Sequence, residues 1–290
     1  MRAKFCFAAI VLVAGFMAQP ARAGSSFFFS TGDTDGKMAM ASRPSSSGKI
    51  EIEAADDFVL TTTTNHTSAT FTGLLPTTAS LSDVTDVRVE IYRVFPKDSG
   101  PFDNNVPTRV NSPSDVAFAE RSASDHNLTF TPGIISSSFT ASNSVLNGIS
   151  VHSGGNGAVT GQEVQFNVLF STPFTLAADH YFFVPQVELS NGDFFWLSAP
   201  KPIVPPGTPF PPGFTDLQTW MRNEDLQPDW LRVGTDIVGG SPAPQFNAAF
   251  SLDGTIVPEP SSVILLGLGG LGLLGCARWR KRRTTAAYSD

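Results

Sequence analysis

The sequence predicts an all-β protein, a single β-sandwich domain of jelly-roll-like type flanked by an N-terminal signal peptide and a C-terminal single transmembrane helix. Apolar and polar residues alternate in many short runs, as at Val87, Val89 and Ile91 with Arg88 and Glu90 between them. This period of two is typical of a half-buried strand. Helical periodicity is rare. Each end of the chain carries an apolar run beside basic residues, which is typical of membrane targeting.

Residues 1–23 are predicted to be a secretory signal peptide. Arg2 and Lys4 lie at the start of an apolar stretch that is shorter than the roughly 20 residues of a membrane span. Ala21 and Ala23 supply small side chains at the two positions that signal peptidase reads. We therefore expect signal peptidase to cleave after Ala23, so that the body of the protein is exported.

The exported body is predicted to be one β-sandwich domain over residues 24–254. Eleven short runs, most of them rich in Phe, Val, Ile or Thr, follow one another with few helical patterns between them. One short helix is predicted at 216–223. Six prolines within 201–213 predict an extended loop that crosses the sheet, with Phe210 and Phe214 as its anchors. The predicted strands are 27–30, 49–53, 58–61, 68–74, 87–95, 128–131, 136–141, 163–170, 181–189, 194–199 and 246–252.

The body is acidic and lacks cysteine. Between Gly24 and Pro260 there are 11 Lys and Arg residues against 25 Asp and Glu residues. This excess of negative charge repels nucleic acid, so no nucleic-acid partner is expected. The two cysteines, Cys6 and Cys276, lie outside the body, which excludes a disulfide, a cysteine nucleophile and a zinc–thiolate site from it.

Segment 255–283 has the layout of a sorting signal, and a predicted linker at 254–260 overlaps its start. Residues 261–277 are almost wholly apolar and are predicted to form a transmembrane helix. The basic residues that follow keep the end of the chain, including 284–290, in the cytoplasm, because positive charge resists translocation. These stop-transfer residues are Arg278, Arg280, Lys281, Arg282 and Arg283.

The residues before this span are Val257, Pro258, Glu259 and Pro260. A Pro-Glu-Pro motif followed by an apolar span and an Arg-rich end resembles the PEP-CTERM sorting signal of Gram-negative bacteria, also labelled an ice-binding protein C-terminal domain. The resemblance implies recognition by an exosortase, a membrane cysteine transpeptidase that cuts near the motif. It also implies that the helix anchors the protein only transiently in the inner membrane, before delivery to the cell surface or extracellular matrix. Exopolysaccharide is then a candidate partner, and a tail shared by unrelated cargoes assigns no ice binding to the body.

The body also resembles secreted β-sandwich modules that are common upstream of sorting signals. This resemblance implies a fold and no reaction. It rests on the runs at 55–60, 69–71, 89–92, 174–176 and 180–182.

A candidate calcium site is present near the start of the body. Asp33 and Asp35 alternate in the glycine-rich run 32–36, and a hard cation such as Ca²⁺ requires several oxygen ligands. An ordinary turn explains the same residues and is favoured, because Asp and Gly favour turns. No other cofactor is predicted, since the histidines lack the local spacing of metal ligands. They are His66, His126, His152 and His180.

Two further constellations concern sugars. Trp220 and Trp230 lie in a polar segment beside the proline-rich loop and are the candidates for stacking on sugar rings, although aromatic residues in strands are usually core. Glu188 and Asp193 are one carboxylate pair that a glycosidase could use. No Gly-x-Ser-x-Gly motif occurs, so the sequence gives no nucleophilic serine around which to build a serine-hydrolase triad.

These observations predict an exported cell-surface or matrix protein, associated with exopolysaccharide, sorted by exosortase and without catalytic activity. Two alternatives stay open. One is a carbohydrate-binding module, which exposed aromatic residues in one groove would favour. The other is a secreted, carboxylate-dependent glycoside hydrolase, which two convergent carboxylates in a cleft would favour.

Overall fold

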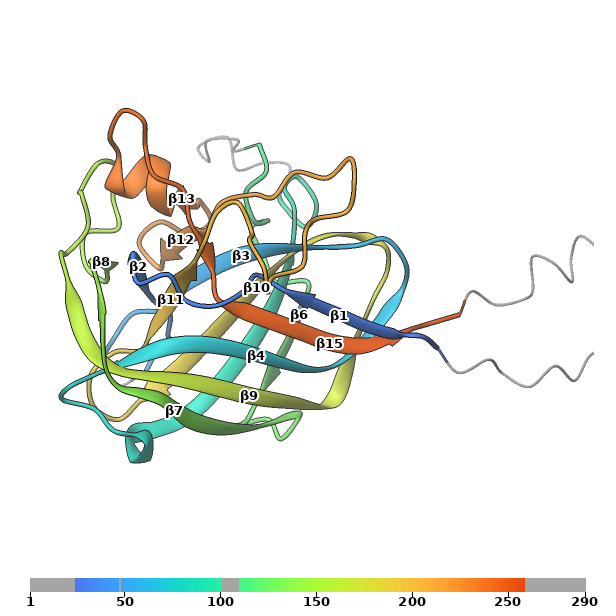
Figure 1. Cartoon of the computed structure of the whole chain (residues 1–290), viewed down its shortest axis with the longest axis horizontal. Coiled ribbons are helices and arrows are strands. Elements are labelled where there is room, and N and C mark those ends of the chain that lie inside the picture. The colour runs from blue at the N-terminus through green and yellow to red at the C-terminus, as the bar shows by residue number, and fades with distance from the viewer. Residues whose placement is uncertain (1–23, 47, 101–109, 259–290) are drawn as a thin grey trace, which may run out of the picture. The chain divides into compact units, whose positions relative to one another are not determined.

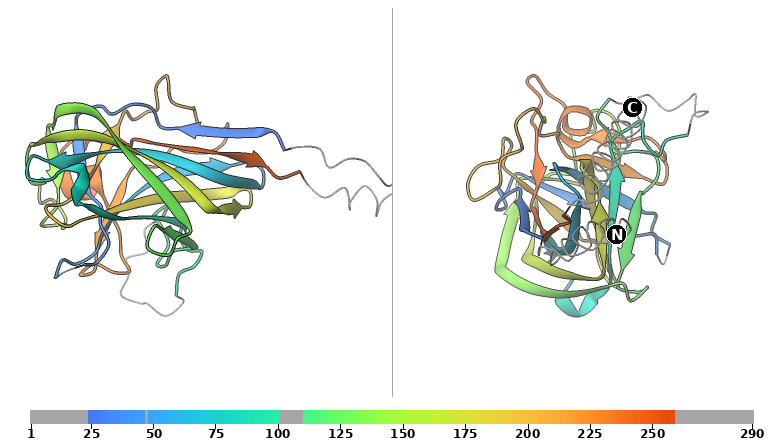
Figure 2. Two further views of the ribbon diagram at one scale, coloured as in Figure 1. Left: turned by 90° about the horizontal axis from the view of Figure 1, so that it is seen from below. Right: turned by 90° about the vertical axis from the view of Figure 1, so that its right-hand side faces the viewer.

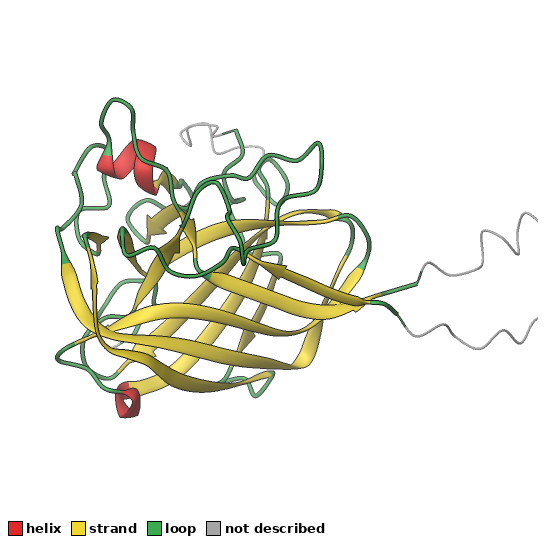
Figure 3. Ribbon diagram, in the orientation of Figure 1, coloured by secondary structure: helices red, strands yellow, loops and turns green. Residues whose placement is uncertain are grey.

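The computed structural model describes residues 24–46, 48–100 and 110–258. Residues 24–257 form one compact unit, built mainly from strands (Figure 3). Two short helical segments interrupt them, the 3₁₀-helix η1 (Leu81–Asp83) and the π-helix η2 (Val233–Val238). The mostly β architecture predicted from the alternating pattern is confirmed.

Two sheets pack against each other as a sandwich (Figure 1). The nine-stranded sheet has the order β1-β15-β4-β11-β2-β8, with β14 beside β11, β9 beside β4 and β7 beside β9. Its strands are β1 (Ser26–Ser30), β2 (Met38–Ala41), β4 (Thr64–Pro76), β7 (Leu128–Ala141), β8 (Asn143–Val145), β9 (Val159–Leu176), β11 (Phe195–Ala199), β14 (Asn247–Ala248) and β15 (Phe250–Ile256).

The six-stranded sheet has the order β13-β12-β3-β10-β5-β6. All its pairs are antiparallel. Its strands are β3 (Ile52–Leu60), β5 (Val84–Arg93), β6 (Ala119–Ser122), β10 (Asp179–Leu189), β12 (Trp220–Asn223) and β13 (Leu231–Arg232).

Aromatic side chains fill the space between the two sheets. Phe183 of the six-stranded sheet stacks on Phe250 of the nine-stranded sheet, with ring centroids 5.0 Å apart, and Phe71 stacks on Phe166 at the same separation. Trp196 is fully buried, and its indole Nε1 donates to the backbone oxygen of Ala249 at 2.9 Å. Burial of these large apolar rings is the main favourable contribution to folding.

The six-stranded sheet is covered on both faces. Every residue of β3 is buried, and a second, smaller core lies on the face of the sheet that points away from the sandwich interior. Period-two patterning predicts one solvated face, whereas here Leu217 and Trp230, from the segments before β12 and β13, pack on it. The second core consists of Ala55, Tyr92, Phe182, Val184, Leu217, Trp220 and Trp230.

Most predicted strands are confirmed, and several differ in extent. The runs 128–131 and 136–141 are two parts of β7, which carries register irregularities between Ile134 and Phe139. The predicted helix at 216–223 is wrong, because 220–223 form β12 and pair with β3. The predicted linker begins later than residue 254, since β15 continues to Ile256.

The proline-rich segment 201–213 is an extended loop, as predicted, without regular strands. Phe210 anchors it, because its ring packs edge-on against Phe29 of β1 with centroids 5.7 Å apart. Phe214 is exposed, and its ring lies 6.3 Å from the ring of His180.

The first and last strands of the described unit lie side by side, as Figure 2 shows. Ser26 pairs with Thr255, and the backbone nitrogen of Ile256 donates to Ser25 at 2.8 Å. Val257, the first residue of the predicted motif, still donates its backbone nitrogen to Thr63 at 2.8 Å. Ordered hydrogen bonding therefore continues up to the motif.

Two predicted membrane elements lie outside the described residues, namely the signal peptide at 1–23 and the transmembrane helix at 261–277. Within the described ranges, none of the helices has the length and apolar character needed to span a bilayer.

Candidate functional site

The outer face of the nine-stranded sheet carries polar side chains. Along β4, Ala69 and Phe71 point into the core, so Thr70 and Thr72 point outward, because successive residues of a strand face opposite sides. On β15, Ser251 lies on the same outer face as Thr70, and the two hydroxyl oxygens are 2.7 Å apart. The side of the nine-stranded sheet that points away from the core therefore carries hydroxyl groups.

Strand register aligns five of these polar residues across five neighbouring strands. Ser30 of β1 is opposite Ser251 of β15, and Ser251 is opposite Thr70 of β4. Thr70 is in turn opposite Asn167 of β9, which is opposite Thr131 of β7. We call Ser30, Ser251, Thr70, Asn167 and Thr131 the polar row. Figure 1 shows β1, β15, β4, β9 and β7 in this order across one face.

A pocket of about 440 Å³ opens on this face beside the polar row, and its lining residues come from β1, β15, β4, β9 and β7. We call it the outer-face pocket. Phe28 of β1 and Ile135 of β7 contribute apolar walls, and each is 55% exposed. Hydroxyl and amide groups make up much of the remaining lining, from Ser30, Thr70, Thr72, Gln165 and Ser251. Such a mixture of an exposed ring with neutral hydrogen-bonding groups suits a polar, uncharged ligand.

The loop after β1 closes one side of the pocket. The Thr34 hydroxyl donates to Glu163 Oε1 of β9 at 2.6 Å and ties the loop to the sheet. Asp33 is exposed and lines the pocket. Two carboxylates therefore lie on the pocket wall, and they disfavour an anionic ligand.

The predicted calcium pair is not assembled as a site. Asp35 Oδ1 accepts hydrogen bonds from the Ser198 hydroxyl at 2.5 Å and from the backbone nitrogen of Lys37 at 3.0 Å, and Oδ2 lies 3.1 Å from Lys37 Nζ. Asp35 thus has protein partners, whereas Asp33 faces the pocket. Across the described ranges, no group of three or more His, Cys, Asp or Glu side chains is placed to hold a metal ion.

The predicted sugar-stacking residues are buried, so that prediction is wrong. Trp220 is 3% exposed and Trp230 is 1% exposed. The Trp230 indole nitrogen donates to the backbone oxygen of Ser114 at 3.1 Å, and both rings belong to the second core. A polar stretch of sequence surrounds them, yet Trp220 lies on β12, which pairs with β3 in the six-stranded sheet.

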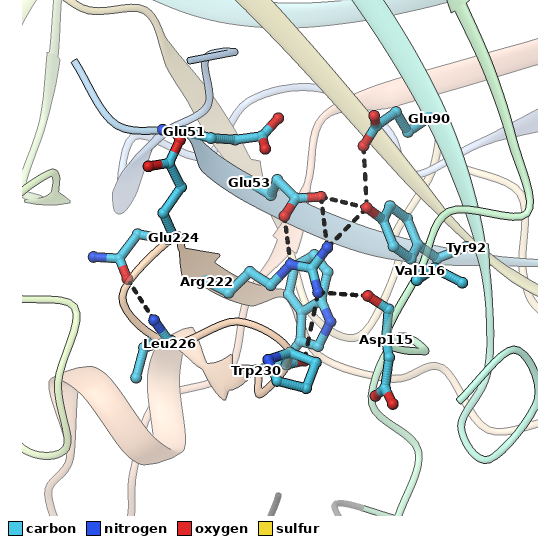
Figure 4. A network of polar contacts seen from close by, with 12 residues as sticks. Glu51, Glu53, Glu90, Tyr92, Asp115, Val116, Arg222, Glu224, Leu226 and Trp230 are labelled. Carbon is cyan, nitrogen blue, oxygen red and sulfur yellow. Dashed lines mark hydrogen bonds and ion pairs between the residues drawn. The ribbon is translucent and has the colours of Figure 1, made fainter. Parts of the chain in front are cut away.

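A buried charged network lies beside Trp230 (Figure 4). Arg222 of β12 donates from Nε to Glu53 of β3, and from Nη2 to the Tyr92 hydroxyl at 2.9 Å. The Tyr92 hydroxyl donates to Glu53 Oε1 at 2.6 Å and lies 3.2 Å from Glu90 Oε2. All four side chains are almost completely buried, so this network has a structural role in joining β12, β3 and β5.

Burial and neighbouring carboxylates alter the ionisation of this network. Desolvation, followed by repulsion from Glu53 and Glu51, raises the pKa of Glu90 to about 8. Desolvation also raises the pKa of the Tyr92 phenol, with Glu53 and Glu90 adding to the effect. Glu90 therefore takes up a proton at a pH where an ordinary carboxyl is ionised.

A second buried network joins the proline-rich loop region to β3. Asp57 Oδ2 lies 2.6 Å from His180 Nε2 and accepts from the backbone nitrogen of Leu217 at 3.1 Å. Burial raises the pKa of Asp57 well above its usual range and lowers the pKa of His180 to about 4. Both shifts disfavour the charged forms of the two side chains. Asp56, on the opposite face of β3, accepts from the backbone nitrogen of Ala248 at 2.8 Å.

The other histidines occupy separate environments. His66 of β4 is buried, neither ring nitrogen has a hydrogen-bond partner, and its ring meets Phe27 edge-on with centroids 5.1 Å apart. Desolvation lowers the pKa of His66 to about 4. His126 and His152 have positive φ angles of 58° and 56°, a conformation found in turns.

One member of the carboxylate pair considered for a glycosidase, Asp193, is engaged in ion pairs. Asp193 forms ion pairs with Arg43 and, at 3.1 Å, with Lys49 Nζ. Glu188 of β10 is half-buried. Both cations contact the same atom, Asp193 Oδ1, so this carboxylate is engaged in ion pairs within the fold.

Sequence reasoning missed the polar row. The alternation of Gln165 and Asn167 with apolar neighbours does identify them as the solvated side of β9. Their alignment with Thr70 and Ser251 depends on strand register, which involves residues far apart in the chain and leaves no local signal.

Comparison with known proteins concerns the end of the chain. Residues 257–283 match the family described as the PEP-CTERM protein-sorting motif. Searches among curated proteins and among solved structures found no match. Of the matched residues, Val257 and Pro258 lie in the described part of the chain. The chain therefore carries a PEP-CTERM protein-sorting motif, which implies a protein that is exported, processed by exosortase and sorted to the cell surface.

Proposed function

We propose that the exported chain is a non-catalytic protein of the cell surface or extracellular matrix of a Gram-negative bacterium, and that it binds uncharged exopolysaccharide in the outer-face pocket. Signal peptidase and exosortase would process its ends, after transient anchoring in the inner membrane. The observation that carries the proposal is the juxtaposition of an exposed phenyl ring, Phe28, with neutral hydroxyl and amide groups in one pocket.

The chemistry of the lining matches that of a sugar. Sugar hydroxyls both donate and accept hydrogen bonds, as do the hydroxyls of Thr70, Thr72 and Ser251 and the amide of Gln165. The apolar face of a pyranose ring packs on an aromatic ring, and Phe28 is exposed for such a contact. Both kinds of contact are offered by one surface.

Charge favours an uncharged polysaccharide. Residues 24–260 carry 25 acidic residues against 11 basic ones, and Asp33 and Glu163 lie on the pocket wall. An anionic polysaccharide would be repelled at this site. A neutral chain avoids that cost.

The strand order supports the jelly-roll-like arrangement predicted from sequence. Strands β2-β11-β4-β9 form one layer and β3-β10-β5-β6 the other, and lectin domains are among the proteins built this way. This is support by analogy of fold, so the proposal depends on the pocket itself.

The absence of catalysis is part of the proposal. The carboxylate of Glu163 accepts a hydrogen bond from Thr34 at 2.6 Å, and Asp193 is paired with Arg43 and Lys49. Neither arrangement favours the glycoside hydrolase alternative, which needs one acid and one base on opposite sides of a bond.

Native gel electrophoresis of the exported protein, in gels containing hydroxyethylcellulose, dextran or alginate, tests the proposal. We expect retardation by at least one uncharged polysaccharide and none by alginate. Phe28→Ala and Gln165→Ala should each weaken the retardation about tenfold, the loss of roughly 1.4 kcal/mol per contact. Phe118→Ala, an exposed phenylalanine on the six-stranded sheet side, is the matched control and should bind normally.

Two results would overturn the proposal. One is the absence of retardation by every uncharged polysaccharide, or retardation that Phe28→Ala leaves unchanged. The other is release of new reducing ends from the bound polysaccharide, because that would make the protein a hydrolase.

A further inference from the structure

We infer that the ligand is an extended, uncharged glycan chain that lies across the strands from β1 to β7, following the polar row along the outer-face pocket. This inference rests on the proposed function and adds the class of glycan, its direction and the length that is bound. It assigns a binding role to Asn167 and Thr131, which lie beyond the pocket lining.

The spacing of the row is set by the sheet. Neighbouring strands are about 4.8 Å apart, so the four steps from Ser30 to Thr131 span about 19 Å. One step is comparable in length with one pyranose ring in an extended chain. A chain of about four sugars that crosses the strands would therefore meet a polar side chain at every ring.

The far half of the row is open to solvent. Asn167 and Thr131 are both exposed. The side-chain nitrogen of Asn167 donates a long hydrogen bond of 3.3 Å to the backbone oxygen of Thr131. Both side chains are thus accessible, and the Asn167 amide is held by a hydrogen bond.

The residues on either side of the row leave room for a chain. Gly133 of β7 is opposite Gln165, and a Cβ atom placed there would meet nothing within 4 Å. The neighbouring row contains Phe28 at the β1 end and Leu169 of β9, which is 62% exposed. These two apolar groups offer contacts for ring faces about three strand spacings apart, or roughly 14 Å.

The absence of charge along the row selects the class of glycan. Ser30, Ser251, Thr70, Asn167 and Thr131 are all neutral, and the nearest charged group in the next row is Asp253, opposite Phe28. An extended, β-1,4-linked neutral chain presents hydroxyl groups along both edges, whereas a coiled chain cannot follow a straight row. The geometry therefore favours a cellulose-like chain over a dextran-like one.

Calorimetric titration of the exported protein with cellobiose, cellotetraose and cellohexaose tests this inference. Affinity should rise at least tenfold from cellobiose to cellotetraose and change little beyond it. Asn167→Ala and Thr131→Val should each lower the affinity for cellohexaose about fivefold to tenfold and leave cellobiose binding unchanged. Thr129→Val, on the same face of β7 but opposite Leu169, is the matched control and should bind like the natural protein.

The outcomes separate this inference from the proposed function. If hydroxyethylcellulose retards the protein and Phe28→Ala weakens the effect, while Asn167→Ala and Thr131→Val bind cellohexaose normally, the pocket is a glycan site and the extended row is not. Binding to dextran without binding to cellohexaose also overturns the row. If no polysaccharide binds at all, the proposed function fails with it.

Discussion

The guanidinium carbon of Arg222 lies 4.4 Å from the centre of the Trp230 ring. This contact places a cation over the face of an aromatic ring inside the second core. The same guanidinium also binds Glu53, so one residue connects an ion pair to an apolar cluster. Figure 4 shows Arg222 with its ion-pair partner Glu53 and the adjacent indole of Trp230.

Replacing Arg222 by methionine should destabilise the fold by about 3–5 kcal/mol, because it leaves the Glu53 carboxylate buried without its counter-charge. Urea unfolding at neutral pH measures the loss. Arg232→Met is the control. Arg232 pairs with Asp236 nearer the surface, so its removal should cost about 1 kcal/mol or less. Equal losses for the two variants would contradict a structural role for the Arg222 network.

Glu90→Gln should stabilise the protein at alkaline pH. The folded pKa of about 8 lies above the ordinary value of 4.5, so ionisation of Glu90 weakens the fold progressively as the pH rises from about 4.5 to 8. Glutamine cannot ionise. We expect the variant to be more stable by about 2–4 kcal/mol at pH 9 and similar to the natural protein near pH 4. Urea unfolding at both pH values checks this, and a difference that does not depend on pH would refute it.

His66→Phe should make the protein more resistant to acid. Because the folded pKa of His66 is lowered from 6.5 to about 4, stability is retained above pH 6.5 and lost as the pH falls toward 4. A phenyl ring keeps the contact with Phe27 and has no proton to bind. Between pH 7.5 and 4.5 the natural protein should lose about 2–3 kcal/mol more than the variant. Parallel losses in the two proteins would rule out His66 as the source.

Gly73→Ala should destabilise the protein, whereas Gly133→Ala should not. A Cβ atom on Gly73 of β4 would lie 2.1 Å from the Phe194 ring and 2.6 Å from the Phe195 oxygen, an overpacking that costs about 1–3 kcal/mol. Gly133 on β7 faces open space. Thermal unfolding of the two variants provides the comparison, and a stable Gly73→Ala variant would show that the interface between β4 and Phe194 can relax.

Deleting residues 258–260 should leave unprocessed protein in the membrane fraction, because the deletion removes the centre of the sorting motif at 257–283. Immunoblots of membrane and culture fractions measure processing. Deleting residues 288–290, which lie beyond the matched segment, is the matched control. Normal release of the 258–260 deletion would exclude this motif as the processing signal.

Local sequence patterns predict much of this fold. The alternation at Val164, Phe166 and Val168 identifies the core face of β9, and the prolines of 201–213 mark the loop. Such patterns do not predict strand register or contacts between residues that are far apart in the chain. Arg222 and Glu53 are separated by 169 positions in the chain, so their ion pair leaves no local trace.

Two errors share one physical cause. Trp220 and Trp230 lie among polar residues, and a helix at 216–223 has a plausible polar pattern. Both interpretations assume that a polar segment lies against solvent. Here 220–223 pair with β3 as a strand, and the Trp220 ring packs into the second core. Tertiary pairing outweighs the local preference of a short segment.

The pairing of β1 with β15 has a consequence for the order of events during export. β1, the first strand of the body, pairs with β15, the last strand, and Ser26 is opposite Thr255. Contacts between such distant segments form late, since the intervening chain must first be available. An exported chain crosses the membrane progressively, so β15 becomes available to pair with β1 only after nearly the whole body has crossed. Pairing of β1 with β15 therefore requires that translocation of the body is complete.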